Sequence, residues 1–101
     1  MANIMEETYP DMMSNITAFI TINTETKKDS KICDKLFKLP EVKEVYCMHG
    51  SIDVLVKIVL TRDMLTSDAE IIGQFVHQKV RKLQGILSTQ TLIPISAQTK
   101  G

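Results

Sequence analysis

The segment with the clearest chemical potential is the tetrapeptide Gly50-Ser51-Ile52-Asp53. A glycine lets backbone N–H groups approach an anion such as a carboxylate, and a nearby aspartate can accept hydrogen bonds from an ammonium group. Together the two features suit a zwitterion. The alternative is that Asp53 is a turn residue that bonds its own loop, as aspartate commonly does, and spacing alone favours this alternative.

The histidines and cysteines are too few and too scattered for a predicted metal site. A zinc site needs three or four ligands at defined spacing, whereas His49, His77, Cys33 and Cys47 fall on separate predicted elements. His49 with Asp53 could form an acid–base pair, which keeps a small enzyme open as an alternative. The sequence contains no nucleophile motif, Walker loop or dinucleotide fingerprint, so we predict neither an enzyme nor a cofactor.

Two polar clusters have ordinary structural explanations. Lys79, Arg81 and Lys82 are typical of a solvated helix end, where cations interact well with the helix dipole. The hydroxyls of Thr89 and Thr91 could line a pocket or simply pair across strands, and the structural role is slightly favoured. We therefore expect neither cluster to carry chemistry by itself.

Composition and charge limit the compartment and the partners. Residues 1–13 carry three acidic and no basic residues, which is unlike a secretory signal, so we expect a cytoplasmic protein with reduced, packed cysteines rather than a disulfide. No apolar run approaches the roughly 20 residues that cross a bilayer. Twelve basic and twelve acidic residues give a net charge of zero, which argues against direct nucleic-acid binding.

The elements that must position these residues follow from apolar periodicity and turn signals. Pro40 ends a first helix, Gly50 lies in a hairpin turn, Ser67 and Glu70 form a capping box, and Gly85 ends the second helix. We predict a strand at 16–22, a helix at 29–39, strands at 42–49 and 52–60, a helix between Ser67 and Gly85, and a strand at 86–95.

This order predicts an α+β fold of the ferredoxin-like βαββαβ type, with a four-stranded antiparallel sheet and two helices on one face. Pro94 places the end of the last strand at a sheet edge. We expect one domain over residues 15–96, preceded by a tail or arm over residues 1–14 and followed by a C-terminal tail over residues 97–101.

The second face of the sheet is the main clue to assembly. The aliphatic sides of residues 16–22 and 52–60 must face the helices, which leaves the other face open. Contiguous exposed apolar patches usually mark interfaces, so we predict a dimeric α/β barrel closed through this face; the alternative is that its residues are scattered and solvated. The residues assigned to the open face are Phe19, Tyr46, Met48, Leu55, Val59, Thr89 and Thr91, of which Phe19, Tyr46, Leu55 and Val59 form the predicted dimer interface.

Over residues 18–95 the chain resembles the ligand-binding domain of the Lrp/AsnC family, the leucine-responsive and asparagine-responsive regulators. The resemblance rests on Leu39-Pro40-Glu41-Val42, on the Gly50–Asp53 tetrapeptide, and on the run from Gly85 to Ile93 that contains Thr89 and Thr91. Each motif is weak alone, but their order and spacing together are fairly specific. The resemblance implies a small-molecule-binding domain whose dimers assemble further, often as an octameric ring, with an amino-acid effector held between dimers at the hairpin loop.

The same resemblance assigns roles within the loop. Gly50 and Ser51 would offer backbone donors to the effector carboxylate, and Asp53 would hold the ammonium group or order the loop. The flanking and pocket-lining residues would be Met48, His49, Thr89 and Thr91.

Two departures from the family pattern shape the functional expectation. Full-length members carry an N-terminal helix-turn-helix domain, whereas here residues 1–14 precede the first strand, so we expect a stand-alone form without direct DNA binding. Ile52 stands where the family often has an aromatic residue, which alters the pocket wall. The leading hypothesis is a domain that senses an amino acid or a similar small metabolite and modulates transcription through full-length Lrp/AsnC regulators. The alternatives are a small dimeric enzyme using His49 and Asp53, and a purely structural oligomerisation subunit.

Overall fold

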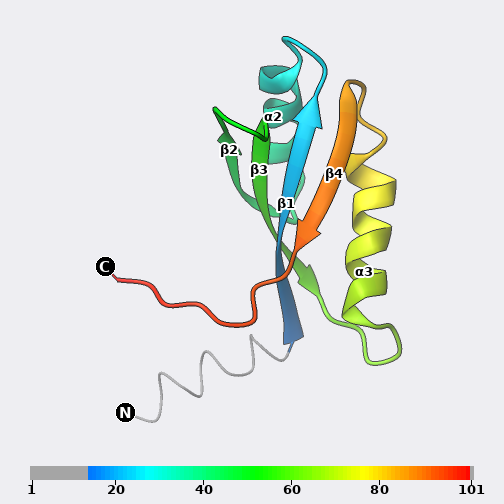
Figure 1. The fold of residues 1–101 in the computed structure, drawn as a ribbon. Helices are drawn as coiled ribbons and strands as arrows, with labels where there is room; N and C mark the ends of the chain where they lie inside the picture. The colour runs from blue at the N-terminus through cyan, green and yellow to red at the C-terminus, as the bar shows by residue number, and fades with distance from the viewer. Residues whose placement is uncertain (1–13, 101) are drawn as a thin grey trace.

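The computed structural model describes residues 14–100, which fold as the predicted βαββαβ arrangement (Figure 1). Of the predicted N-terminal tail, residues 1–13 lie outside this range. The predicted element order is confirmed, and the bounds differ from the predicted ones by a few residues. The elements are β1 (Asn15–Thr24), α2 (Asp29–Phe37), β2 (Val42–Cys47), β3 (Val54–Thr61), α3 (Asp68–Phe75), a π-helical turn η1 (Val76–Val80) and β4 (Ile86–Leu92).

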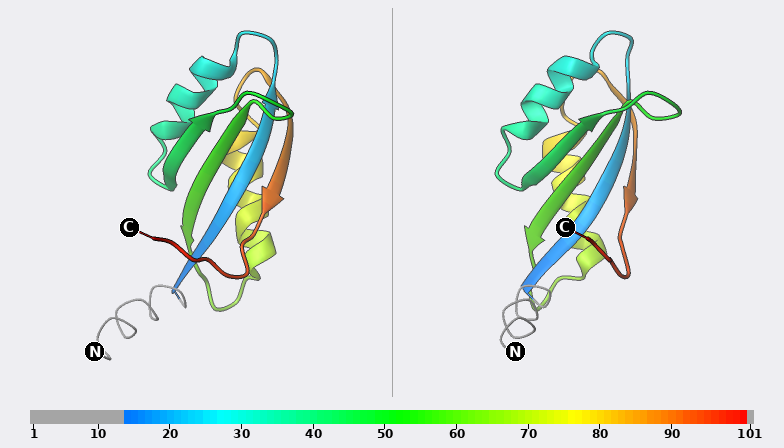
Figure 2. Two further views of the ribbon diagram at one scale, coloured as in Figure 1. Left: turned by 60° about the vertical axis from the view of Figure 1, so that its left-hand side comes forward. Right: turned by 90° about the vertical axis from the view of Figure 1, so that its left-hand side faces the viewer.

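The four strands form one antiparallel sheet in the order β2-β3-β1-β4. The alternating residues of β1 and β3 that were predicted to face the helices are buried, because period-two side chains point to one face of a strand. Figure 2 shows α2 and α3 packed on that face. The fully buried centre of the core comprises Ala18, Ile20, Ile22, Leu36, Val54, Val56, Ile58 and Val80.

Helix α2 ends at Phe37, two residues before the predicted end at Leu39. The backbone N–H groups of Lys38 and Leu39 donate to carbonyls three residues earlier, those of Lys35 and Leu36. The chain therefore tightens into a turn before it reaches Pro40, which disfavours helical geometry in the residue before it.

Helix α3 begins at the predicted capping box. The Ser67 hydroxyl oxygen accepts from the Glu70 backbone N–H at 3.2 Å, and the same hydroxyl donates to Glu70 Oε1 at 3.1 Å. The face of α3 that packs on the sheet includes Phe75, which is buried, whereas Ala69 is exposed. A helix face that covers a sheet is wider than one line of residues, and Phe75 occupies the position beside Val76 on that face.

The turn before β4 needs its glycine. Gly85 has a φ of +100°, and a Cβ atom there would lie 2.9 Å from Cδ of Lys28. Its carbonyl accepts from the Glu25 N–H at 2.8 Å, which joins this turn to the loop after β1. An L side chain at position 85 would meet both a strained backbone and a close neighbour.

The register of β4 corrects one predicted face. Thr89 pairs with Ile22 and Thr91 with Ile20, and these two isoleucines are fully buried on the helix side. Because directly opposite residues share a face, Thr89 and Thr91 lie on the helix side, and their assignment to the open face was wrong. The four-residue polar run 88–91 has no apolar period that could set the phase of this strand. Its edge position agrees with the prediction, but the strand ends at Leu92, three residues before the predicted end and before Pro94.

Candidate functional site

The loop between β2 and β3, residues 48–53, is a short exposed hairpin connection. The Met48 N–H donates to the Asp53 carbonyl at 2.8 Å and closes the loop at its base. Gly50 has a φ of +152°, and a Cβ atom there would meet nothing within 4 Å, so the demand for glycine is conformational. In the right-hand view of Figure 2 the loop projects from the top of the sheet, away from α2. Its exposed residues are Met48, His49, Gly50 and Ser51.

Asp53 anchors this loop to the neighbouring strand. Its Oδ2 accepts from the Thr24 backbone N–H at 2.8 Å, and its own N–H donates to the Ile22 carbonyl at 3.0 Å. Asp53 is half-buried and Thr24 is buried, so the bond satisfies a backbone donor that water reaches poorly. The structural alternative for Asp53 was a bond within its own loop; the bond instead goes to β1. The carboxylate is thereby held at a fixed position at the base of the loop.

The other predicted site residues, His49, Thr89 and Thr91, are not all close to Asp53. His49 is exposed within the same loop, whereas the Asp53 Oδ2 atom is already used by Thr24. Thr89 lies on the far side of Ile22, two strand spacings or roughly 10 Å away, and Thr91 lies farther along β4. One copy of the chain therefore gathers residues 48–53 but does not bring the two threonines to them.

The open face of the sheet carries apolar and polar side chains side by side. Tyr46 pairs with Leu55 across β2 and β3, and Phe19 pairs with Leu92 across β1 and β4. Tyr46 and Leu92 are 47% and 46% exposed, and Phe19 and Leu55 are half-buried, as is Val59. Leu92 was missed because the sequence did not set the phase of β4.

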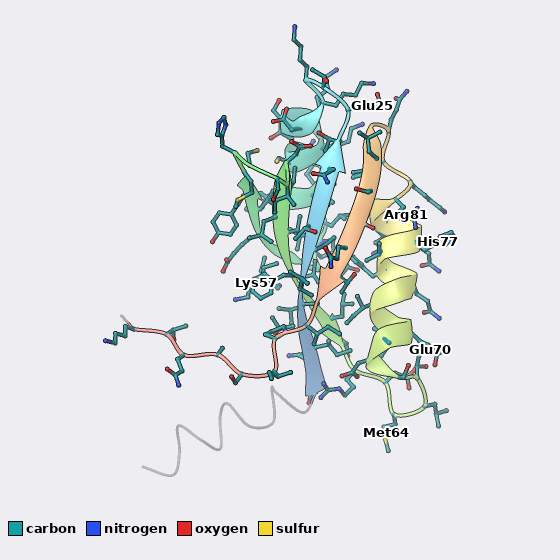
Figure 3. The ribbon with its side chains drawn as sticks, viewed as in Figure 1. Glu25, Lys57, Met64, Glu70, His77 and Arg81 are labelled. Carbon is teal, nitrogen blue, oxygen red and sulfur yellow. The ribbon has the colours of Figure 1, made fainter. Side chains whose placement is uncertain are left out.

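A polar chain crosses this face. Lys57, labelled in Figure 3, lies 3.5 Å from Glu44 Oε2, and the Tyr46 hydroxyl donates to Glu44 Oε1 at 2.7 Å. The Tyr46 hydrogen bond, followed by the Lys57 charge, lowers the pKa of Glu44, and the same hydrogen bond raises the pKa of Tyr46. The open face therefore presents apolar side chains around the ion pair of Lys57 and Glu44.

The outer side of η1 and of the residues that follow it is solvated. His77, on η1, and Arg81 point away from the sheet in Figure 3. Lys79 is exposed as predicted, and its Nζ also donates to Glu41 Oε2 at 2.6 Å. This pair lies beside a groove of about 690 Å³ that His77 does not line. The Lys79 hydrogen bond is the main cause of a lowered pKa at Glu41, whose Oε1 is buried without a hydrogen-bond partner.

The two cysteines behave differently from each other. Both are free thiols; Cys33 is buried as predicted, whereas Cys47, predicted to be packed, is exposed.

Within residues 14–100, no group of three or more His, Cys, Asp or Glu side chains is placed to hold a metal ion. Among the same residues, no helix is long and apolar enough to span a membrane.

Comparison with known proteins gives one consistent match. The family model for the Lrp/AsnC ligand binding domain matches residues 17–100. The HTH-type transcriptional regulator FL11 of Pyrococcus furiosus is 37% identical over 79 residues, which cover 78% of this chain and 48% of that protein. The chain thus spans about half the length of the curated relatives it matches.

Solved structures share the fold. The hypothetical protein PHS023 from Pyrococcus horikoshii is 35% identical with a TM-score of 0.64, covering 81% of this chain and 92% of that one. The transcriptional regulator NMB0573 from Neisseria meningitidis, solved as a complex with L-Met, has a TM-score of 0.67 at 22% identity, covering 84% of this chain and 53% of that one. The second likeness supports the fold alone.

Proposed function

Since this chain belongs to the Lrp/AsnC family, as a ligand-binding domain, we propose that it is an oligomer-forming regulatory domain that senses an amino acid or a similar small metabolite. The binding site is the loop 48–53, and the observation that carries this assignment is the fixed carboxylate of Asp53 at the base of an exposed glycine loop. A zwitterion needs an anionic group and backbone N–H donors close together, and this loop supplies both.

We propose the roles within the loop that the family resemblance implies. Asp53 keeps its place through the Thr24 bond, so its negative charge can attract an ammonium group without the cost of ordering a flexible side chain. Gly50 and Ser51 offer backbone N–H groups to the effector carboxylate, while Met48 and His49 flank the effector side chain. The L-Met bound to the Neisseria meningitidis regulator is an example of the effector class that we propose here.

Assembly completes the site. We place the dimer contact on the open face, through Phe19, Tyr46, Leu55 and Val59, because this face would otherwise leave large apolar side chains in water. The loop 48–53 lies at the rim of the sheet, where dimers can meet in a ring such as an octamer (Figure 2). Strand β4 is an edge strand, so Thr89 and Thr91 of a neighbouring copy can reach an effector held between dimers. Effector binding would then stabilise the assembly by linkage.

The regulatory output runs through other proteins. The relatives are HTH-type transcriptional regulators, so we propose that this domain acts in the cytoplasm on full-length Lrp/AsnC regulators. Its net charge of zero does not favour direct binding to DNA. A non-enzymatic role fits the site, because Asp53 Oδ2 bonds the Thr24 N–H rather than His49. A small enzyme using His49 and Asp53, and a purely structural oligomer, are the competing functions.

A thermal-shift screen against the twenty L-amino acids tests this function, with the D-enantiomers as matched controls and light scattering on each sample. We expect one or a few L-amino acids to raise the unfolding temperature of an oligomer, while their D-enantiomers do not. A well-formed oligomer that no L-amino acid stabilises would overturn amino-acid sensing and favour the structural subunit.

A further inference from the structure

Cys33 and Cys47 come from different elements and meet in space. Their Sγ atoms are 2.7 Å apart, although 14 residues separate them in the sequence, and both are free thiols. This separation is shorter than the normal approach of two non-bonded sulfur atoms and is within 1 Å of the S–S bond length of about 2 Å. We propose that Cys33 and Cys47 are a redox pair that forms a reversible intrachain disulfide between α2 and the end of β2.

Each cysteine belongs to a regular element, and only Cys33 is buried. Cys33 lies between Ile32 and Leu36 on the buried side of α2 and is 9% exposed. Cys47 pairs with the fully buried Val54, so the register directs its side chain toward the helices. Because a helix face and a strand both fix their own cysteine, the bond can form with little backbone movement.

The two thiols are unequal, which sets the order of the chemistry. Burial, followed by the Cys47 hydrogen bond and the nearby charges of Asp29 and Asp34, raises the pKa of Cys33 to about 12, so this thiol stays protonated at neutral pH. Cys47 is exposed and meets an oxidant from solvent first. Cys47 is therefore the attacking residue and Cys33 the resolving one.

The oxidant that we assign is a low-molecular-weight disulfide, and the exchange then balances in two steps. The Cys47 thiol loses its proton to solvent, and its sulfur attacks one sulfur of the oxidant, which releases one thiolate and leaves a mixed disulfide on Cys47. The thiolate released in the first step then takes the proton of Cys33 as the Cys33 sulfur attacks the Cys47 sulfur. The second thiolate leaves and takes a proton from solvent. Two protein thiols are oxidised to one disulfide, and one small disulfide is reduced to two thiols.

The bond would act at the base of the loop 48–53. Cys47 directly precedes Met48, whose N–H closes the loop on the Asp53 carbonyl at 2.8 Å. Joining Cys47 to α2 would restrain this closure. Any effect on effector affinity rests on the proposed function, whereas the bond itself needs no effector and is measured separately.

The test is a thiol–disulfide equilibrium of the full chain in buffers of reduced and oxidised glutathione. Free thiols are trapped by alkylation and counted by intact mass, with the same chain in urea as reference. We expect the native chain to form the Cys33–Cys47 disulfide at a ratio of reduced to oxidised glutathione at least about tenfold higher than the unfolded chain requires. The reason is that folding holds the two sulfurs together. Equal ratios for the native and unfolded chains, or bonds that join separate chains, would overturn the proposal.

Two serine variants control for the chemistry. Cys47→Ser changes an exposed side chain and should fold normally, and Cys33→Ser tests the buried partner. Each variant should keep one thiol, which can bind at most one glutathione and cannot form an intrachain disulfide. Hydrogen exchange of residues 48–53 should slow when the wild-type chain is oxidised and stay constant in Cys47→Ser. Unchanged exchange in a fully oxidised wild-type chain would refute the restraint on the loop.

Discussion

The two faces of the sheet are built by the same strands and differ in what covers them. On the helix side, Ile20, Val56 and Ile58 are completely buried. On the open side, their neighbours in sequence are half-buried, and the large side chains of Tyr46 on β2 and Leu92 on β4 are 47% and 46% exposed. Buried aliphatic side chains supply most of the folding free energy of a small domain, whereas exposed large apolar ones mark surfaces that bind. The comparison separates the residues that fold the domain from those that assemble it.

The largest expected effect comes from the helix side. Ile20→Ala should lower the free energy of unfolding by about 2–5 kcal/mol, because it removes buried methyl groups and leaves a cavity. Thr21→Ala changes the next residue of the same strand, on the open face, and should cost only about 1 kcal/mol or less, because it removes one long hydrogen bond of 3.5 Å to the Gln90 carbonyl and creates no buried cavity. Urea denaturation measures both. Similar losses for the two variants would contradict the division between the faces.

The next effect concerns assembly rather than folding. Leu55→Glu places a charge within the proposed interface and should raise the dimer dissociation constant at least about tenfold, since hot-spot residues at interfaces contribute more than 1 kcal/mol. Leu65→Glu is a matched control on the loop after β3, where the side chain is 96% exposed. Light scattering over a dilution series reads out the mass. An unchanged mass for Leu55→Glu would remove the open face from the interface.

A third change tests the anchor beneath the loop. Asp53→Ala removes the acceptor for the Thr24 N–H and should cost about 1–3 kcal/mol, because it leaves a buried donor unpaired. Asp53→Asn keeps an acceptor oxygen and should retain most of the stability. Hydrogen exchange at Thr24 should accelerate in the alanine variant alone. Equal exchange in both variants would show that the bond does not hold the loop.

The smallest expected effect is a pH dependence of the stability that the Lys79–Glu41 ion pair contributes. The Lys79 bond lowers the pKa of Glu41 below its ordinary 4.5, so its contribution is present above that value and is lost as the pH falls through the lowered pKa. For a partly exposed pair the contribution is about 0.5 kcal/mol. A double-mutant cycle with Glu41→Gln and Lys79→Met, measured at pH 7 and pH 3, should show a larger coupling at pH 7 than at pH 3. Equal coupling at both values would exclude the ion pair as its cause.

The same comparison explains what could be predicted from the sequence. Alternation in residues 16–22 and 52–60 identified the buried face, because a strand with one dry face must alternate. The capping box at Ser67 and the turn at Gly50 are local signals, and the structure shows both. The motifs of residues 39–53 and 85–93 indicated the family, which the comparisons confirm.

The remaining features depend on how elements dock. The phase of β4, and hence the position of Thr89, Thr91 and Leu92, is set by pairing with β1 rather than by its own polar run. The Lys79–Glu41 contact joins residues 38 positions apart. The meeting of Cys33 with Cys47 likewise needs α2 to pack on the sheet. No local sequence pattern predicts these three contacts, because each joins residues from different elements and forms only when those elements pack together.

The most direct test of the proposed function is a calorimetric titration of the amino acid selected by the screen into three chains. Asp53→Asn removes the charge while keeping an acceptor for Thr24, so it separates binding from folding. Asp63→Asn is the matched control, since Asp63 accepts from Leu65 and Thr66 in a different loop. We predict that wild type and Asp63→Asn bind alike, while Asp53→Asn binds at least about tenfold more weakly, as expected for a lost charge-assisted hydrogen bond. Wild-type affinity in Asp53→Asn would contradict the assignment of the effector site to this loop.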